Sequence, residues 1–135
     1  MVRKFFIVLL LLFGEFSLGL YAAENEVLWE KVSDNNYINP DGITGTDDMY
    51  GFTFLLKSYN KGQYEPVNGK KISYTIGRYS IDCGRYTYKI GVIDSYGTDD
   101  NFITGDYNRY AKFQPIVEGT AVGNVAKRLC RPLNH

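Results

Sequence analysis

The chain contains only two cysteines, Cys83 and Cys130, and their positions constrain the fold more than any other feature. Cys83 lies in a stretch rich in aromatic and β-branched residues, Tyr79–Ile90, that is typical of a β-hairpin. Cys130 closes a short helical pattern near the C-terminus. A bond between them would enclose a loop of about 47 residues, which in the chain-entropy model stabilises the fold by roughly 4 kcal/mol. We therefore predict one disulfide that ties a central hairpin to a terminal helix.

The N-terminal residues predict export, and export explains why the cysteines should pair. Arg3 and Lys4 precede a continuous apolar run, Phe5–Phe13, and a stretch of small and mixed residues follows as far as Ala23. This three-part pattern is typical of a secretory signal peptide at residues 1–23. The alternative is a membrane anchor, but the apolar run spans only about half of a bilayer core. We expect no membrane span after signal removal. An exported chain meets an oxidising environment, in which two cysteines form a disulfide rather than stay free thiols.

Residues 24–135 are long enough for a single domain with one modest core. Tyrosine is frequent, and Thr, Val, Ile and Phe occur in short runs separated by Gly, Asn and Asp, which is the composition of strands and turns. Alternation predicts strands or extended segments at Val27–Val32, Tyr37–Ile38, Met49–Tyr59, Lys71–Cys83 and Tyr86–Asp94. A last strand is expected within Phe102–Phe113, best placed at Arg109–Phe113. The same alternation places on one face Tyr86, Tyr88, Ile90 and Val92.

After Pro115 and Gly119 the apolar period becomes helical. Thr120 is expected to cap this helix and Pro132 to end it, while Gly123 inside it should cost about 1 kcal/mol relative to Ala. One apolar stripe is formed by Val122, Val125, Ala126, Leu129 and Cys130. We therefore predict an α+β fold: a twisted antiparallel β-sheet of about five or six strands with a C-terminal α-helix tethered by the disulfide. Breaking the disulfide should loosen the helix first.

Residues that usually carry catalysis or bind metals are scarce. The only histidine is His135, and no nucleotide-binding, zinc-protease or nucleophile-elbow motif occurs. A hydrolase with two carboxylates stays compatible with the composition, but we interpret Asp82, the one acid in an apolar stretch, as a strand-end residue. Gly-Thr-Asp-Asp occurs at Gly45–Asp48 and Gly97–Asp100, and it favours turns over calcium loops because its acids do not alternate. We predict no enzyme activity, no cofactor and no metal site.

The charges balance, with 15 Lys and Arg against 15 Asp and Glu, but they are segregated along the chain. Acidic residues predominate from Glu24 to Asp48 and basic residues from Met49 to Lys89. In the basic part, tyrosines interleave with Lys and Arg, and Tyr and Arg commonly anchor binding interfaces. The alternative is an ordinary solvated sheet face. We predict a face that binds a protein or an acidic glycan, and no nucleic acid because the chain is exported. Its residues are Lys57, Tyr59, Lys61, Tyr64, Lys70, Lys71, Tyr74 and Arg78.

A series of segments, taken in this order, resembles one known family. The series comprises Asn36–Ile43, Leu56–Gly62, Ser80–Cys83 with Tyr86 and Tyr88, and the region from Pro115 and Gly119 to Leu129–Cys130. It is similar to the surface-adhesin protein E-like family over nearly all of residues 24–135. The resemblance implies an antiparallel sheet with a disulfide-tethered C-terminal helix and a bacterial envelope location. It also implies attachment to host matrix proteins.

The chain departs from that family in two places. No cysteine lies near the predicted cleavage site, so we expect no lipid anchor there, and a periplasmic or released protein is as compatible as surface display. Gly42 and Gly45 predict a short second strand. The first functional hypothesis is an adhesin-like envelope protein that binds matrix proteins or other macromolecules through the basic–aromatic face. The alternative is a soluble periplasmic structural or assembly accessory protein, which pairs through an exposed sheet edge as a homodimer or with an envelope partner.

Overall fold

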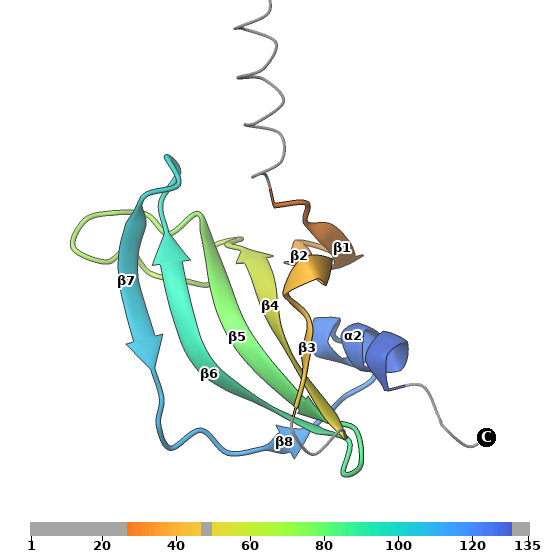
Figure 1. Cartoon of the computed structure of the whole chain (residues 1–135). Coiled ribbons are helices and arrows are strands. Elements are labelled where there is room, and N and C mark those ends of the chain that lie inside the picture. Colours follow the sequence, from red (N-terminus) through yellow and green to blue (C-terminus); the bar gives the residue numbers. More distant parts are fainter. Residues whose placement is uncertain (1–26, 47–49, 131–135) are drawn as a thin grey trace, which may run out of the picture.

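The computed structural model describes residues 27–46 and 50–130 (Figure 1). The predicted signal peptide at residues 1–23 lies outside these residues. So do Asp47 and Asp48 of the first Gly-Thr-Asp-Asp segment, Pro132 and His135. Within the described part of the chain, no helix is both long and apolar enough to cross a membrane.

The strands form an antiparallel sheet whose order across the main path is β1-β2-β4-β5-β6-β7, with short β3 paired to β4 and β8 to β6. Strands β2 and β3 are only three and two residues long. The region near Gly42 and Gly45 thus forms short strands, as predicted. With its C-terminal helix, this sheet confirms the predicted α+β fold. The strand bounds are β1 Glu30–Ser33, β2 Asn36–Ile38, β3 Thr44–Gly45, β4 Gly51–Tyr59, β5 Tyr74–Asp82, β6 Thr87–Tyr96, β7 Phe102–Tyr107 and β8 Gln114–Pro115. A 3-10 turn, Pro40–Gly42, separates β2 from β3.

Helix α2, Ala121–Leu129, begins where the sequence predicts it. The Thr120 hydroxyl accepts a hydrogen bond from the Gly123 amide at 3.0 Å, which satisfies one of the free donors of the first turn. Gly123 is needed at this position, because an added Cβ would lie 2.4 Å from the carbonyl oxygen of Val117. Glycine is a poor helix former, but at this position it lets the loop before the helix pack closely against the first turn.

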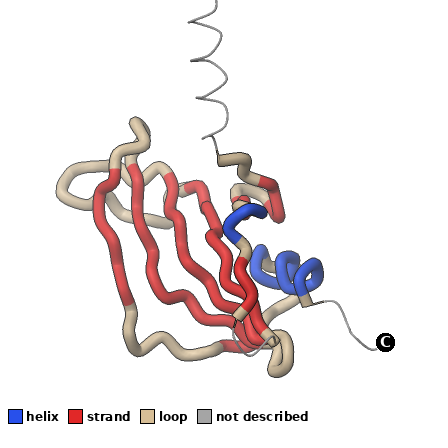
Figure 2. The backbone as a smooth tube through the Cα atoms, in the orientation of Figure 1, coloured by secondary structure: helices blue, strands red, loops and turns tan. Residues whose placement is uncertain are grey.

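The helix packs its apolar stripe onto one face of the sheet. Val125 and Ala126 are completely buried, and the side-chain amide of Asn124 donates to the Val32 carbonyl of β1 at 2.8 Å. Figures 1 and 2 show α2 beside β1 and β2, with β6 and β7 at the far side of the sheet. The core consists of Ile38, Phe54, Leu56, Ile81, Ile116, Val122, Val125 and Ala126.

The strand register separates the two faces of the sheet. Phe54 and Leu56 of β4 face α2, so Leu55 between them faces away. We call the face that is turned away from α2 the open face and the other the helix-side face. Following the register of β4, β5 and β6, the open face includes Leu55, Lys57, Tyr59, Tyr74, Ile76, Arg78, Lys89, Val92, Asp94 and Tyr96.

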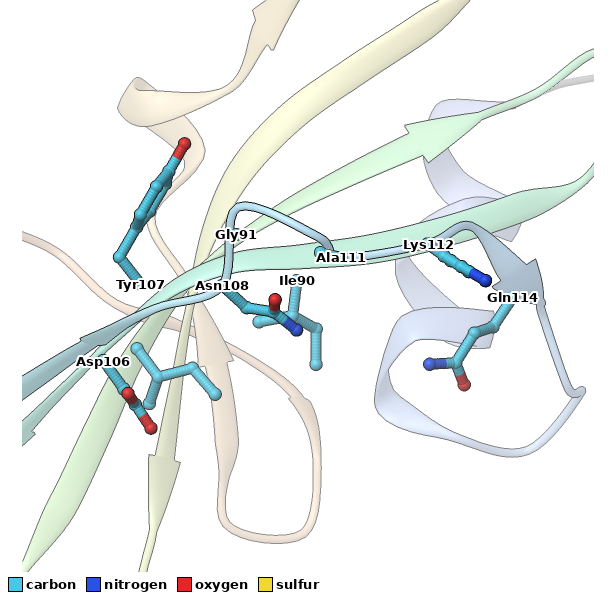
Figure 3. A pocket seen from close by; sticks show the side chains of 9 residues that line it. Ile90, Gly91, Asp106, Tyr107, Asn108, Ala111, Lys112 and Gln114 are labelled. Atoms are coloured by element: carbon cyan, nitrogen blue, oxygen red, sulfur yellow. The ribbon is translucent and has the colours of Figure 1, made fainter.

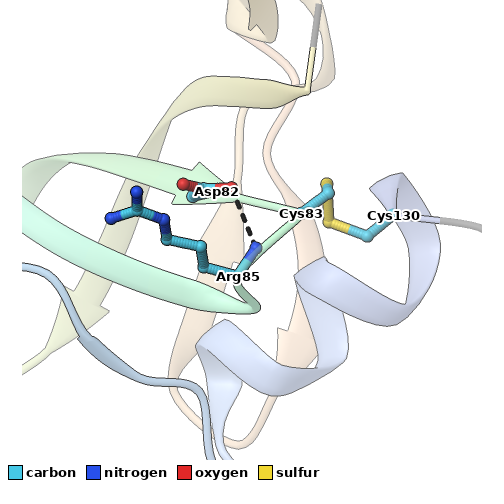
Figure 4. The surroundings of a disulfide bond; sticks show 4 residues. All are labelled: Asp82, Cys83, Arg85 and Cys130. Atoms are coloured by element: carbon cyan, nitrogen blue, oxygen red, sulfur yellow. Dashed lines mark hydrogen bonds between the residues drawn. A yellow bond between two sulfur atoms is a disulfide. The ribbon is translucent and has the colours of Figure 1, made fainter.

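The disulfide between Cys83 and Cys130 joins the β5–β6 turn to the end of α2, with 5.3 Å between the Cα atoms (Figure 4). The Asp82 carboxylate accepts a hydrogen bond from the Arg85 amide at 3.1 Å, and Tyr86 has φ of 56°. These residues complete the reversal between the two strands. The predicted disulfide is confirmed, and Asp82 acts as the strand-end residue that the sequence indicated.

A β-bulge in β6 corrects the predicted orientation of Val92. Ile90 pairs with Tyr79 whereas Val92 pairs with Arg78, so Gly91 is the extra residue. The extra residue shifts the alternation, which leaves Ile90 on the helix-side face and moves Val92 to the open face. The prediction from strict alternation was wrong here because a single glycine is the only local sign of the bulge.

Most strand bounds differ from the predicted ranges by up to three residues, and the last long strand lies in another part of its predicted region. The first begins at Glu30 rather than Val27, and the last long strand is Phe102–Tyr107 rather than Arg109–Phe113. Residues 108–113 form a connection instead, in which the Ala111 amide donates to the carbonyl of Asn108 at 3.1 Å. Strand β7 lies at the edge of the sheet and is largely exposed. It therefore has little of the apolar alternation on which the prediction depended.

Candidate functional site

Four of the predicted binding residues, Lys57, Tyr59, Tyr74 and Arg78, lie together on the open face. Tyr59 is directly opposite Tyr74, and Lys57 is directly opposite Ile76, the residue midway between Tyr74 and Arg78 on that face. Side chains directly opposite each other in an antiparallel pair share a face and lie about 5 Å apart. The register of β4 and β5 thus gathers these groups without any contribution from a loop.

Lys57 is surrounded by aromatic rings. Its Nζ lies 4.3 Å from the ring centroid of Tyr74, 5.1 Å from that of Tyr59 and 5.5 Å from that of Trp29. A ring face attracts a cation by about 1 kcal/mol when the pair is partly desolvated. Lys57 forms no ion pair with any described residue. Its charge is therefore held on the open face by rings and remains available to an anionic partner.

A row of aromatic rings crosses the open face over neighbouring strands. The ring centroids are 5.7 Å apart between Tyr37 and Tyr59, 5.8 Å between Tyr59 and Tyr74, 5.1 Å between Tyr74 and Tyr96, and 6.0 Å between Tyr96 and Phe102. Such pairs contribute about 1 kcal/mol each beyond the area that they bury. The row connects β2, β4, β5, β6 and β7 side by side, so it stiffens the face that also carries Lys57.

The Tyr74 hydroxyl has a defined partner. It donates to the Asp100 carboxylate at 2.9 Å. Burial, followed by this hydrogen bond and the nearby negative charge, raises the pKa of Tyr74 to about 12. The hydroxyl therefore keeps its proton throughout the physiological range and fixes the loop that bears Asp100 to the aromatic row.

Beside Arg78 the open face has a shallow hollow of about 340 Å³. Its floor is apolar, and one cation and one carboxylate stand among the lining residues. Arg78 itself is exposed. The hollow is lined by Leu55, Ile76, Arg78, Val92, Asp94 and Tyr96.

The other four predicted binding residues, Lys61, Tyr64, Lys70 and Lys71, lie in the connection between β4 and β5. Tyr64 is exposed, and its backbone amide donates to the side-chain oxygen of Asn60 at 3.2 Å. Lys70 and Lys71 line a hollow of about 290 Å³. Its remaining lining residues are Gly97, Thr98, Asp99, Asn101, Phe102 and Ile103. Phe102 also ends the aromatic row, so these two lysines adjoin the open face at one corner.

A larger hollow of about 520 Å³ opens between β6 and the connection from β7 to β8 (Figure 3). Its polar side chains do not converge. Figure 3 shows Asp106 at one end of the hollow, with Lys112 and Gln114 at the other. The backbone amide of Asn108 donates to the Gly91 carbonyl at 3.0 Å, which links the β7–β8 connection to β6. This arrangement does not suggest a catalytic constellation.

The second Gly-Thr-Asp-Asp segment is a turn. The Asp99 carboxylate accepts hydrogen bonds from the backbone amide of Asn101 at 3.2 Å and from its side chain, and the backbone bond is the main reason that the pKa of Asp99 is lowered. Asp100 is engaged by Tyr74. Among residues 27–46 and 50–130, no group of three or more His, Cys, Asp or Glu side chains could hold a metal ion.

Several residues of the open face were missed by sequence reasoning, namely Trp29, Tyr37, Asp94, Tyr96 and Phe102. A signal for two of them existed. Tyr96 and Phe102 flank a short polar loop, Gly97–Asn101, so a hairpin across that loop would have paired their rings. Trp29 and Tyr37 are far away in sequence from Lys57, and only the register of β2 on β4 brings Tyr37 beside it.

The structure therefore defines a class of protein: a twisted antiparallel sheet with one face closed by a disulfide-tethered C-terminal helix and the other bearing aromatic and basic side chains. No protein-family profile matches the sequence. No curated protein sequence matches it either.

Solved structures with this fold exist. Haemophilus influenzae protein E in its crystal form II superposes with a TM-score of 0.58 at 14% identity, over 76% of this chain and 86% of that one. Protein E from non-typeable Haemophilus influenzae gives a TM-score of 0.57 at 16% identity, over 78% of each chain. A selenomethionine form of protein E gives 0.57 at 16% identity, over 76% of this chain and 84% of that one. The chain thus has the protein E fold, which confirms the structural part of the resemblance.

Proposed function

We propose that this protein is a non-enzymatic, adhesin-like protein of the bacterial envelope that binds host matrix proteins or other macromolecules through its open face. The observation that carries the proposal is that Lys57 and Arg78 lie on the same face of the sheet, which α2 does not cover. The ammonium group of Lys57 is held by aromatic rings, and the guanidinium group of Arg78 is exposed. Aromatic residues and arginine are the side chains that most often anchor protein interfaces.

The fold supports the envelope assignment. This chain is crosslinked by the Cys83–Cys130 disulfide, and disulfides persist in oxidising compartments. The predicted signal peptide at residues 1–23 agrees with export. Because fold alone does not determine function, the adhesive role is supported by the open face rather than by the superposition.

Binding to a matrix protein tests the proposal. We expect the disulfide-bonded protein to bind a fibronectin-coated surface, and the binding to weaken as salt is raised because exposed charges are screened. Reversing the charges of the open-face residues Lys57, Arg78 and Lys89 by substitution with Glu should abolish the binding. The matched control reverses Arg109, Lys112 and Lys127, which lie on the β7–β8 connection and on α2. Equal loss in both triple variants would reject the open face as the binding surface.

Protease accessibility tests the location. A tag at the C-terminus of the mature protein would be followed on intact cells treated with protease. Digestion from outside would support surface display. Protection until the outer membrane is permeabilised would reject the adhesin hypothesis and favour a periplasmic role.

A second candidate function is a periplasmic structural or assembly accessory protein. It is favoured by β7, which forms an outer edge of the sheet and exposes 58% of Phe102 and 67% of Tyr107. An exposed edge strand offers unpaired backbone groups to a partner strand. Size-exclusion chromatography coupled to light scattering would reveal self-association. Substituting Tyr107 by Pro should prevent pairing at this edge, because the N–H of Tyr107 points away from β6 in the register of the two strands. The charge reversals above should leave such pairing intact.

A further inference from the structure

Three cations from three adjacent strands fall on one diagonal of the open face: Lys57 on β4, Arg78 on β5 and Lys89 on β6. Arg78 is directly opposite Leu55, two residues from Lys57 on the same strand. Lys89 is directly opposite Ser80, two residues beyond Arg78. Each step therefore crosses one strand and advances two residues, a separation of about 8 Å between Cα atoms from strand spacing and rise. We call these three residues the basic diagonal.

The ends of the basic diagonal are fixed in place. Lys57 is held by rings, as described above, and Nζ of Lys89 lies 4.9 Å from the ring centroid of Phe113. Arg78, at the centre, is exposed. None of the three forms an ion pair with another residue of the described ranges. Rings neutralise no charge, so the diagonal presents three regularly spaced positive groups whose positions are restricted before any ligand arrives.

The hollow beside Arg78 indicates which class of polyanion the basic diagonal binds. Its floor of Leu55, Ile76 and Val92 is apolar, while Arg78 and Asp94 provide one cation and one acceptor. A sugar ring presents an apolar C–H face, hydroxyl donors and, in acidic glycans, a sulfate or carboxylate. An acidic peptide could donate to Asp94 through its backbone N–H groups, but its acidic side chains offer no ring with an apolar C–H face to cover Leu55, Ile76 and Val92. The hollow of about 340 Å³ lies at the small end of ligand sites.

We propose that the basic diagonal and this hollow bind a linear sulfated glycan. The chain would cross β4, β5 and β6 obliquely, with its acidic groups on Lys57, Arg78 and Lys89. One sugar ring would rest on the apolar floor, with a hydroxyl donating to Asp94. This inference rests on the proposed function and names the ligand class for the same face.

The test uses the full mature protein with its disulfide intact and a fluorescent heparin dodecasaccharide as the probe. Binding is measured by fluorescence anisotropy over a range of salt concentrations. The double variant Lys57→Gln with Arg78→Gln should bind at least about tenfold more weakly, because each loses a charge-assisted contact. The control Arg109→Gln with Lys127→Gln removes the same charge elsewhere and should change the affinity less than about threefold by general screening. Arg78→Gln alone is an exposed change, so its weaker binding reports on the ligand rather than on folding.

Three outcomes would overturn the inference. The two double variants could lose affinity equally, which would indicate a diffuse charge effect. Poly-glutamate could compete as well as heparin, which would identify an acidic protein as the ligand. The protein could also bind fibronectin and ignore heparin. In this last case the proposed function survives and only the glycan is rejected, whereas failure to bind either probe rejects both.

Discussion

The two faces of this sheet are built in different ways. The helix-side face is closed by aliphatic side chains from α2 and by a covalent bond, and its central residues Phe54 and Ile81 are almost completely buried. The open face has no such cover from α2, and its order comes from rings in a row and from a cation among them. One face therefore supplies most of the stability, while the other keeps charged groups in place at the surface. The predictions below separate these two roles.

The largest effect should come from the disulfide. Replacing Cys83 and Cys130 by Ala removes the crosslink around a long loop and should lower the free energy of unfolding by about 4 kcal/mol. Urea unfolding of the native and double-alanine proteins measures this loss. Because Cys130 ends α2, hydrogen exchange should rise first in Ala121–Leu129 and only later in β4 and β5.

The open face provides the control for this prediction. If the disulfide only closes the helix-side face, the double-alanine protein should bind the heparin probe with unchanged affinity under conditions where it stays folded. Loss of binding before loss of strand structure would show that the two faces are not independent.

Gly123→Ala should have the next largest effect. The new methyl group would meet the Val117 carbonyl oxygen at 2.4 Å, so the loop before α2 must shift. Overpacking of this kind lowers the free energy of unfolding by about 2 kcal/mol, even though alanine is the better helix former. The comparison is Gly45→Ala, where an added Cβ meets nothing within 4 Å. Thermal unfolding of the two variants should show a clear decrease for the first and little change for the second.

Much of the helix-side face could be predicted from the sequence. The stripe Val122, Val125 and Ala126, the cap Thr120 and the two cysteines all depend on local spacing, and the structure confirms each of them. Gly123 was correctly placed in the helix, but its role was missed. The reason is that its contact, the Val117 carbonyl, depends on the path of the preceding loop and not on helical periodicity.

The open face could be predicted only in part. The interleaved lysines and tyrosines were visible in the sequence, yet Tyr64, Lys70 and Lys71 lie in the loop between β4 and β5. The basic diagonal needs Lys89, whose place depends on the register of β6 against β5. Register is set by long-range pairing, and the bulge at Gly91 changes it without a strong local pattern.

A smaller effect is expected from Lys57→Met, which keeps most of the side-chain stem and removes the charge. Loss of the attraction to Tyr74, Tyr59 and Trp29 should lower the free energy of unfolding by about 1 kcal/mol. Urea unfolding provides the measurement, with Lys127→Met on the exposed side of α2 as the matched control. An equal change in both proteins would mean that the rings do not hold Lys57, and the open face would then lack its fixed cation.

The smallest effects concern one tyrosine on each face, and the loss of stability that they cause begins only at alkaline pH. The pKa values of Tyr74 on the open face and Tyr79 on the helix-side face are both raised to about 12, whereas an unfolded tyrosine has a pKa of about 10. Between these values the folded protein holds protons that the unfolded chain has released. Stability from these groups is therefore complete below pH of about 10 and is lost as the pH rises through about 12.

Asp100→Asn distinguishes the two tyrosines. Burial is the main cause of both shifts, but only Tyr74 donates to Asp100. The variant should lower the pKa of Tyr74 and leave that of Tyr79 in place, so ultraviolet titration of tyrosinate should show one group moving toward its ordinary range. Tyr74→Phe identifies which group moved. A pKa change at Tyr79 as well would mean that the Gly97–Asn101 loop influences both faces. The charge of Asp100 would then act through the sheet and not through the single hydrogen bond that holds this loop to the aromatic row.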